Sequence, residues 1–123
     1  MALTNTLYFD KVMSMRDSAT MIWETEAARQ LAGVLTAIDD ARTMQNFLRD
    51  VMTEKEIIEI GARLKAAQML QQGKKYTEII EVTKLSSRTV ARISDWMQNG
   101  CSGYAAVLKL ANSHNDHTSP AHA

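Results

Sequence analysis

Cysteine, proline and glycine are scarce in this chain of 123 residues, which contains one Cys, one Pro and five Gly. The lone Cys101 has no second cysteine for an internal disulfide or a cysteine-based metal site, so the sequence fits a reducing compartment. Stretches rich in Ala, Leu, Ile, Glu, Gln, Lys and Arg favour helices over strands. We therefore predict an all-α fold.

Long apolar segments are also missing. No apolar run approaches the roughly 18–20 residues that cross a bilayer. Asp10 and Lys11 interrupt the apolar stretch near the N-terminus, which is unlike a signal peptide. We therefore expect a cytoplasmic protein with no membrane partner. At this length the chain is large enough for one hydrophobic core but not for two.

Signals for catalysis or metal binding are weak. His114 and His117 are three residues apart and His122 follows, but a zinc ion needs further ligands held in a fixed geometry. Cys101 has no evident base beside it that would activate a thiol nucleophile. No phosphate-binding glycine loop occurs. We expect no catalytic residue, no metal site and no enzymatic activity.

An excess of one charge is absent overall, because 14 Lys and Arg balance 14 Asp and Glu. The distribution is uneven, however. Residues 1–62 contain six Lys and Arg against ten Asp and Glu, whereas residues 63–92 contain seven against two. A basic module on an acidic body indicates a nucleic-acid partner. The alternative is an unevenly charged surface without a function.

What the sequence does contain is a series of amphipathic helical patterns. Asp39 and Asp40 are typical of a helix cap, Thr53 with Glu56 forms a capping box, and Gly73 is typical of a helix C-terminus. Together the apolar spacing and these caps predict helices over about 22–38, 40–51, 54–72 and 104–110.

Two further helical patterns, separated by a short polar turn, lie within residues 76–98. The first contains Tyr76 and Ile79, and the second begins at Ser86 or Ser87 with polar and basic residues. This arrangement predicts a helix-turn-helix, in which the first helix crosses the phosphate backbone and the second enters the major groove. The predicted DNA-binding residues are Lys74, Lys75, Thr77, Lys84, Ser86, Ser87, Arg88 and Arg92.

The predicted turn contains an unusual residue. Lys84 stands where many such turns have a glycine, and a positive φ there would cost about 1 kcal/mol or somewhat more. The alternative to DNA binding is an αα-hairpin with a solvated basic face.

The order of these features resembles the tryptophan repressor superfamily. The resemblance rests on the capping box, Gly61-x-Arg63, Gly73, Thr89-Val-Ala-Arg92 and the segment Gly100–Tyr104, and it covers about residues 25–110. It looks closest to the YerC/YecD-type branch. The resemblance implies about six helices, an intertwined homodimer, double-stranded DNA as partner and a role as a transcriptional regulator that acts as a repressor.

The same resemblance implies a corepressor, either L-tryptophan or another small amino-acid-like molecule. The matching ligand-binding positions are Thr53, Arg63, Thr89 and Arg92. Where the family has a serine that helps to hold the ligand's amino group, this chain has Trp96, whose indole could fill the cavity itself. We therefore expect L-tryptophan not to control DNA binding.

The predicted organisation has three parts, namely an N-terminal arm (1–20), a helical DNA-binding domain (21–111) and a disordered tail (112–123). The apolar stripes of 22–51 are wide for a chain of this size, so we expect a second copy to cover them. A helical protein-interaction module without specific DNA binding stays open as an alternative function. Salt separates the two functions, because DNA binding weakens steeply as salt rises.

Overall fold

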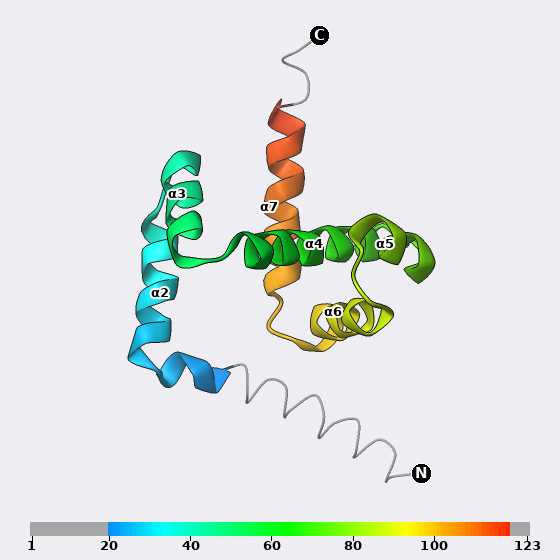
Figure 1. Ribbon diagram of the computed structural model, residues 1–123, viewed down its shortest axis with the longest axis horizontal. Coiled ribbons are helices and arrows are strands. Elements are labelled where there is room, and N and C mark those ends of the chain that lie inside the picture. The colour runs from blue at the N-terminus through cyan, green and yellow to red at the C-terminus, as the bar shows by residue number, and fades with distance from the viewer. Residues whose placement is uncertain (1–19, 119–123) are drawn as a thin grey trace. The chain divides into compact units, whose positions relative to one another are not determined.

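The computed structural model describes residues 20–118, and this part of the chain is helical without any strand (Figure 1). The predicted all-α class and the predicted number of about six helices are confirmed. The predicted N-terminal arm lies almost wholly outside the described residues. The elements are η1 (Ile22–Glu24), α2 (Glu26–Ala37), α3 (Ala41–Val51), α4 (Glu54–Gln71), α5 (Tyr76–Thr83), α6 (Ser87–Asn99) and α7 (Gly103–Thr118).

The chain divides into two compact units, residues 1–62 and residues 63–123, with the boundary inside α4. We call the first the N-terminal unit and the second the head. The described part of the N-terminal unit contains η1, α2, α3 and the beginning of α4. The head contains the rest of α4 and the helices α5, α6 and α7.

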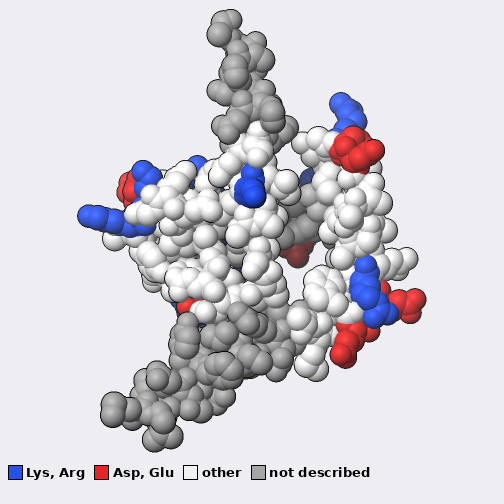
Figure 2. All heavy atoms as spheres, turned by 180° about the vertical axis from the view of Figure 1, so that it is seen from behind, with Lys and Arg blue, Asp and Glu red and all other residues white. Residues whose placement is uncertain are grey.

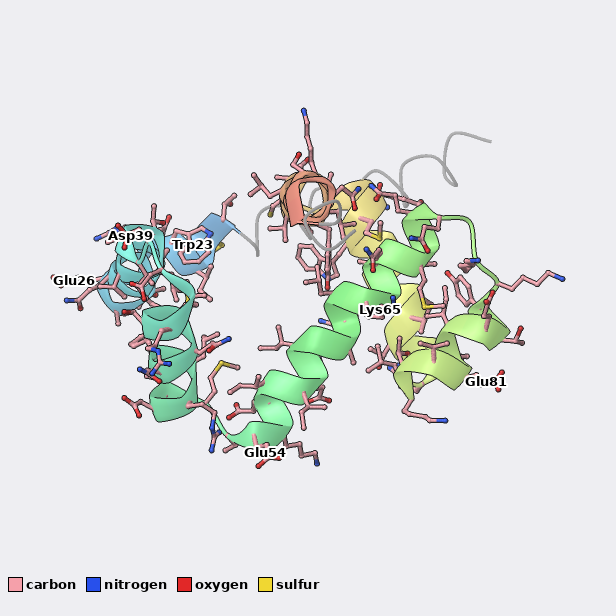
Figure 3. The ribbon with its side chains drawn as sticks, turned by 90° about the horizontal axis from the view of Figure 1, so that it is seen from above. Trp23, Glu26, Asp39, Glu54, Lys65 and Glu81 are labelled. Atoms are coloured by element: carbon pink, nitrogen blue, oxygen red, sulfur yellow. The ribbon has the colours of Figure 1, made fainter. Side chains whose placement is uncertain are left out.

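Local hydrogen bonds stabilise the N-terminal ends of the helices in the N-terminal unit. Thr25 has extended backbone, with φ −76° and ψ 124°, so the predicted first helix is split into η1 and α2. Arg29 Nη1 donates to the carbonyl of Trp23 at 3.1 Å and ties the two pieces together; Figure 3 shows Trp23 beside α2. The N–H of Thr43 donates to Asp40 Oδ2 at 2.9 Å, which confirms the predicted cap of α3.

The predicted capping box at the start of α4 is confirmed. The N–H of Thr53 donates to Glu56 Oε1 at 2.9 Å, and the N–H of Glu56 donates to Thr53 Oγ1 at 3.1 Å. Two free donors at the helix start are thus satisfied by side chains three residues apart. The backbone and side-chain hydrogen bonds from Thr53 hold the pKa of the Glu56 carboxyl below its ordinary value.

The end of α4 has the glycine signature that the sequence predicts. Gly73 has a φ of +79°, and its N–H donates to the carbonyl of Leu70 at 3.0 Å. The N–H of Lys74 donates to the carbonyl of Met69, also at 3.0 Å. This pair of bonds is a Schellman motif, which closes a helix where glycine enters the left-handed region without a Cβ penalty.

The head encloses a hydrophobic core to which all four of its helices contribute. Full burial of the Ile79 side chain on α5 contributes roughly 1.5–3 kcal/mol. Ala66 and Ala67 of α4 are also fully buried. The buried residues are Ala66, Ala67, Met69, Ile79, Val90, Ile93 and Leu108, and Leu70, Ile80, Leu85, Met97 and Tyr104 pack against them.

Helix α7 is longer than predicted. It continues to Thr118 instead of ending near Leu110, so residues 112–118 of the predicted disordered tail are helical. No glycine or proline interrupts this segment before Pro120, and the residue preceding a proline disfavours helical backbone. The side chains of His114 and His117 and the whole of residue His122 lie outside what the structure describes. Among the helices of residues 20–118, none is long and apolar enough to cross a membrane.

Candidate nucleic-acid interface

The structure contains the predicted pair of helices joined by a turn. Helices α5 and α6 lie next to each other in the head and are connected by three residues (Figure 1). Ile79 of α5 and Val90 and Ile93 of α6 belong to the same buried core, and Leu85 of the turn packs against it. This packing fixes the orientation of α6 relative to α5, as a recognition helix requires.

Three hydrogen bonds hold the turn. The N–H of Lys84 donates to the carbonyl of Ile80 at 2.8 Å. Thr83 Oγ1 donates to the carbonyl of Ile79 at 2.7 Å and accepts from the N–H of Leu85 at 3.3 Å. Lys84 has a φ of 62° and a ψ of 14°, so the positive φ considered from the sequence is confirmed.

Ser86, not Ser87, is the N-cap of α6. Its Oγ accepts from the N–H of Thr89 at 3.1 Å and donates to Thr89 Oγ1 at 3.0 Å. The Ser86 hydroxyl is therefore engaged in starting the helix. The side chains of Ser87 and Arg88 occupy the exposed first turn of α6, where a recognition helix contacts base edges.

All eight predicted DNA-binding residues belong to the head and are exposed, namely Lys74, Lys75, Thr77, Lys84, Ser86, Ser87, Arg88 and Arg92. Lys75 is the N-cap residue of α5, so its side chain leaves the chain where that helix begins. Within residues 20–118, the charged groups of the five Lys and Arg in this set have no hydrogen-bond or ion-pair partner. Figure 2 shows separate Lys and Arg side chains, several of them beside acidic ones, on a face that is otherwise largely uncharged. These cations are available to phosphate.

One exposed residue of α6 was missed by the sequence reasoning, which considered only polar side chains. Ala91 is exposed and lies between Arg88 and Arg92. Residues three and four apart share a helix face, so Arg88, Ala91 and Arg92 line one side of α6. The same spacing in the sequence could have identified Ala91, because the buried Val90 and Ile93 define the opposite side. Asp95, three residues after Arg92 and four after Ala91, is the acidic residue on this same side and is half-buried. Glu81 points outward from α5 (Figure 3).

The residues matched to a corepressor pocket have other engagements or face solvent. Thr53 belongs to the N-terminal unit and its hydroxyl takes part in the capping box. Thr89 is half-buried and its hydroxyl accepts from Ser86. Arg63 and Arg92 are exposed in the head.

The Trp96 side chain lies outside the core of the head. It is half-buried, and it is not among the apolar side chains that pack against the head core. Its ring lies instead against the end of α6, where a Cβ added to Gly100 would come within 2.5 Å of both the ring Cε3 and the Trp96 carbonyl oxygen. The ring is therefore not part of the head core, and its entry into a corepressor pocket stays a prediction. The neighbouring Met97 is the residue of this turn that packs against the core.

Comparisons with known proteins agree with this helix-turn-helix architecture. The family described as Trp repressor protein matches residues 26–112, so the chain belongs to the Trp repressor family. The uncharacterized protein YerC of Bacillus subtilis is 29% identical over 79 residues, which are 64% of this chain and 76% of YerC. This supports the predicted placement in the YerC-type branch.

Two solved structures share the fold. A TrpR-like protein from Eubacterium eligens superposes with a TM-score of 0.69 at 29% identity, covering 73% of this chain and 93% of the other. A structure from Staphylococcus aureus has a TM-score of 0.67 at 26% identity, covering 72% of this chain and 88% of the other. Family and fold together suggest a DNA-binding regulator.

Proposed function

We propose that this protein is a sequence-specific transcriptional regulator of the cytoplasm, without enzymatic activity, which represses its targets as a homodimer bound to double-stranded DNA. The observation that supports this most is the exposed first half of α6, where Arg88 and Arg92 have no partner within residues 20–118. A structural helix hairpin has no need for two free guanidinium groups beside a capped helix start.

Each exposed residue has a role that follows from its chemistry. Arg88, in the first turn of α6, can donate two hydrogen bonds to the O6 and N7 of guanine. Ala91 offers a methyl group to the C5-methyl of thymine on the next turn of the same face. Lys75 contacts phosphate, which positions the head without reading sequence. Ser86 positions α6 through its cap.

The N-terminal unit supplies the reason for a homodimer. None of its described residues is buried, although Ile58 and Ile60 on α4 and Leu31 and Val34 on α2 are large and apolar. Exposed apolar side chains of this kind in one protomer are covered most simply by the same surface of a second copy in a two-fold arrangement. Two heads held in this way would meet successive major grooves, roughly 34–36 Å apart.

Enrichment of genomic fragments by the purified protein, followed by sequencing, tests the proposal. We expect a two-fold symmetric motif, and binding to it that weakens steeply between 50 and 200 mM salt because condensed counterions are released from the phosphates. Random duplexes serve as the control and should bind far more weakly at the same salt. Weak binding without a motif, or no binding, would favour the helical protein-interaction module instead.

The dimer has its own measurement. Light scattering at micromolar concentration should report twice the mass of the 13.7 kDa chain. Leu31→Glu introduces a charge into the apolar stripe of α2 and should shift the mass toward that of one chain, whereas Gln30→Glu, on a neighbouring exposed position, should not. A wild-type monomer at this concentration would contradict both the dimer and the symmetric motif.

A further inference from the structure

Two residues other than glycine have positive φ within residues 20–118, namely Lys84 at 62° and Ser102 at 66°. The left-handed region disfavours a residue with a Cβ by about fivefold to thirtyfold relative to right-handed helical backbone, whereas glycine enters it freely. Each position is therefore one where glycine would make the fold more stable. At Ser102 the strain occurs just before α7, outside the helix-turn-helix.

The residues around Lys84 require its backbone conformation, but they do not require a lysine side chain. The N–H of Lys84 closes α5 on the carbonyl of Ile80 at 2.8 Å, and the next residue, Leu85, turns inward to pack against the head core. These two constraints fix φ and ψ and would be met equally by glycine. Nothing within the described residues uses the Lys84 ammonium group, which is exposed and has no partner.

The position of Lys84 gives that free charge a target. It lies two residues before Ser86, the N-cap of α6, in the connection between the two helices that would face DNA. The first N–H groups of a helix and the positive end of its dipole favour an anion. A lysine beside them adds a full charge at the place where the strand backbone would pass.

We infer that Lys84 is a phosphate-contacting residue retained at the expense of the stability of the turn, so that the head exchanges stability for DNA affinity at this single position. This inference rests on the proposed DNA-binding function and assigns one of its residues. The contact is independent of sequence, because phosphates carry no base information. Lys84 therefore sets how tightly the head binds, while Arg88 sets where it binds.

Four variants separate the backbone effect from the charge effect. Lys84→Gly removes both the strain and the charge. Lys84→Asn removes the charge but keeps a residue that tolerates the left-handed region, and Lys84→Arg keeps the charge. Ser102→Gly is the matched control, because it relieves the same kind of strain outside the proposed interface. Each is compared with wild type by denaturant unfolding and by duplex titration at several salt concentrations.

We expect Lys84→Gly to raise the ratio of folded to unfolded protein by about fivefold and yet to weaken binding to specific and random duplexes alike. The slope of log K against log salt should become less negative by about one for each lysine removed. Lys84→Asn should lose the same affinity, and Lys84→Arg should keep it. Ser102→Gly should gain stability with wild-type DNA affinity.

The results that would overturn this inference differ from those that would overturn the proposed function. If the wild type binds duplex DNA and Lys84→Gly binds with the same affinity and salt slope, Lys84 has no phosphate contact, while the proposed function stands. If Lys84→Gly is no more stable than wild type, lysine at this position costs the turn no stability, and the inferred exchange of stability for affinity is wrong. Equal loss of affinity in Ser102→Gly would assign the effect to backbone strain instead of charge. A wild type without salt-dependent duplex binding overturns both proposals.

Discussion

The N-terminal unit and the head have similar helical patterns but differ in what those patterns bury. Ile58 on the part of α4 that belongs to the N-terminal unit is 63% exposed, whereas Ile79 on α5 of the head is fully buried. The head holds every buried residue of the described chain. The comparison teaches that an apolar stripe shows that a helix needs a partner surface, but not which surface covers it. The head supplies such a surface within one chain for its core residues, although Leu110 on α7 remains 70% exposed, whereas the described part of the N-terminal unit buries no residue.

The two units also differ in charge, and the difference has a consequence for binding. The N-terminal unit contains ten Asp and Glu against six Lys and Arg, while residues 63–92 of the head contain two against seven. In the proposed DNA complex, phosphates repel the first and attract the second, so this charge difference would direct DNA to the head. A net charge of zero for the whole chain hides this asymmetry.

The largest effect that we expect is on stability, and it distinguishes the buried Ile79 of the head from the exposed Ile58 of the N-terminal unit. Ile79→Ala leaves a cavity in the closed core and should cost about 2–5 kcal/mol of unfolding free energy at any protein concentration. Ile58→Ala should destabilise in a concentration-dependent way, because in the proposed homodimer a second copy covers the Ile58 side chain. Val82→Ala, at an exposed site of the head, serves as the control and should change stability by no more than about 0.5 kcal/mol. Denaturant unfolding at several protein concentrations measures all three. A small, concentration-independent effect of Ile58→Ala would place no partner on that face.

The next effect distinguishes two cations of the head. Arg88→Ala should lose about 1–3 kcal/mol of discrimination between the preferred and altered motifs, because a bidentate contact to guanine is removed. Lys75→Ala should weaken binding to all duplexes and flatten the salt slope by about one unit per site. Titrations of specific and random duplexes at three salt concentrations test both. Equal losses on both duplexes for the two variants would contradict the division into a base contact and a phosphate contact.

A smaller effect concerns acid, and it is confined to the N-terminal unit. Hydrogen bonds from Thr43 and Thr53 hold the pKa of Asp40 and of Glu56 below the ordinary values of 3.8 and 4.5. Because the folded-state pKa is depressed, the stabilisation is present above the ordinary value and is lost as pH falls through the folded-state pKa. We expect helicity to decline below about pH 4, and Asp40→Asn with Glu56→Gln, which keep the caps without a titrating group, to flatten that decline.

Circular dichroism across the acid range measures this effect. Glu59→Gln, on the same helix as Glu56, is the control, because the Glu59 side chain makes no hydrogen bond within residues 20–118. This variant should leave the acid profile unchanged. If the variant with Asp40→Asn and Glu56→Gln has the same acid profile as the wild type, these two carboxylates do not cause the loss of helicity in acid.

The last prediction is that L-tryptophan has no effect on DNA binding. Trp96 occupies the position that the resemblance assigns to a serine holding the amino group of the ligand, and the hydroxyl of Thr89 is engaged by Ser86. A ligand shifts a conformational equilibrium only by binding its states differently. Millimolar L-tryptophan should therefore leave DNA affinity unchanged, and Trp96→Ser is the variant in which a response would be sought. Saturable calorimetric binding to the wild type, one site per subunit, with a matching rise in DNA affinity, would restore a corepressor mechanism.

The sequence by itself determined the features that depend on residues close to each other in the chain. The caps at Asp40 and Ser86, the capping box of Thr53 with Glu56 and the glycine end of α4 all form as predicted. Donor and acceptor are at most five residues apart in each, so no distant part of the chain can alter the choice. The helix-turn-helix and the exposed basic residues follow from the same local pattern.

Only the tertiary structure decided which apolar residues are enclosed. Ile58 and Ile79 satisfy the same periodicity, yet burial depends on whether another element covers that face, and periodicity does not report this. For the same reason the position of the Trp96 ring, beside Gly100 instead of against the head core, was not predictable from spacing. The break at Thr25 is equally hidden, since the apolar period continues across it. Local hydrogen bonding fixes where helices begin and end, whereas packing between elements distant in the sequence fixes which side chains become core and which remain available to a partner.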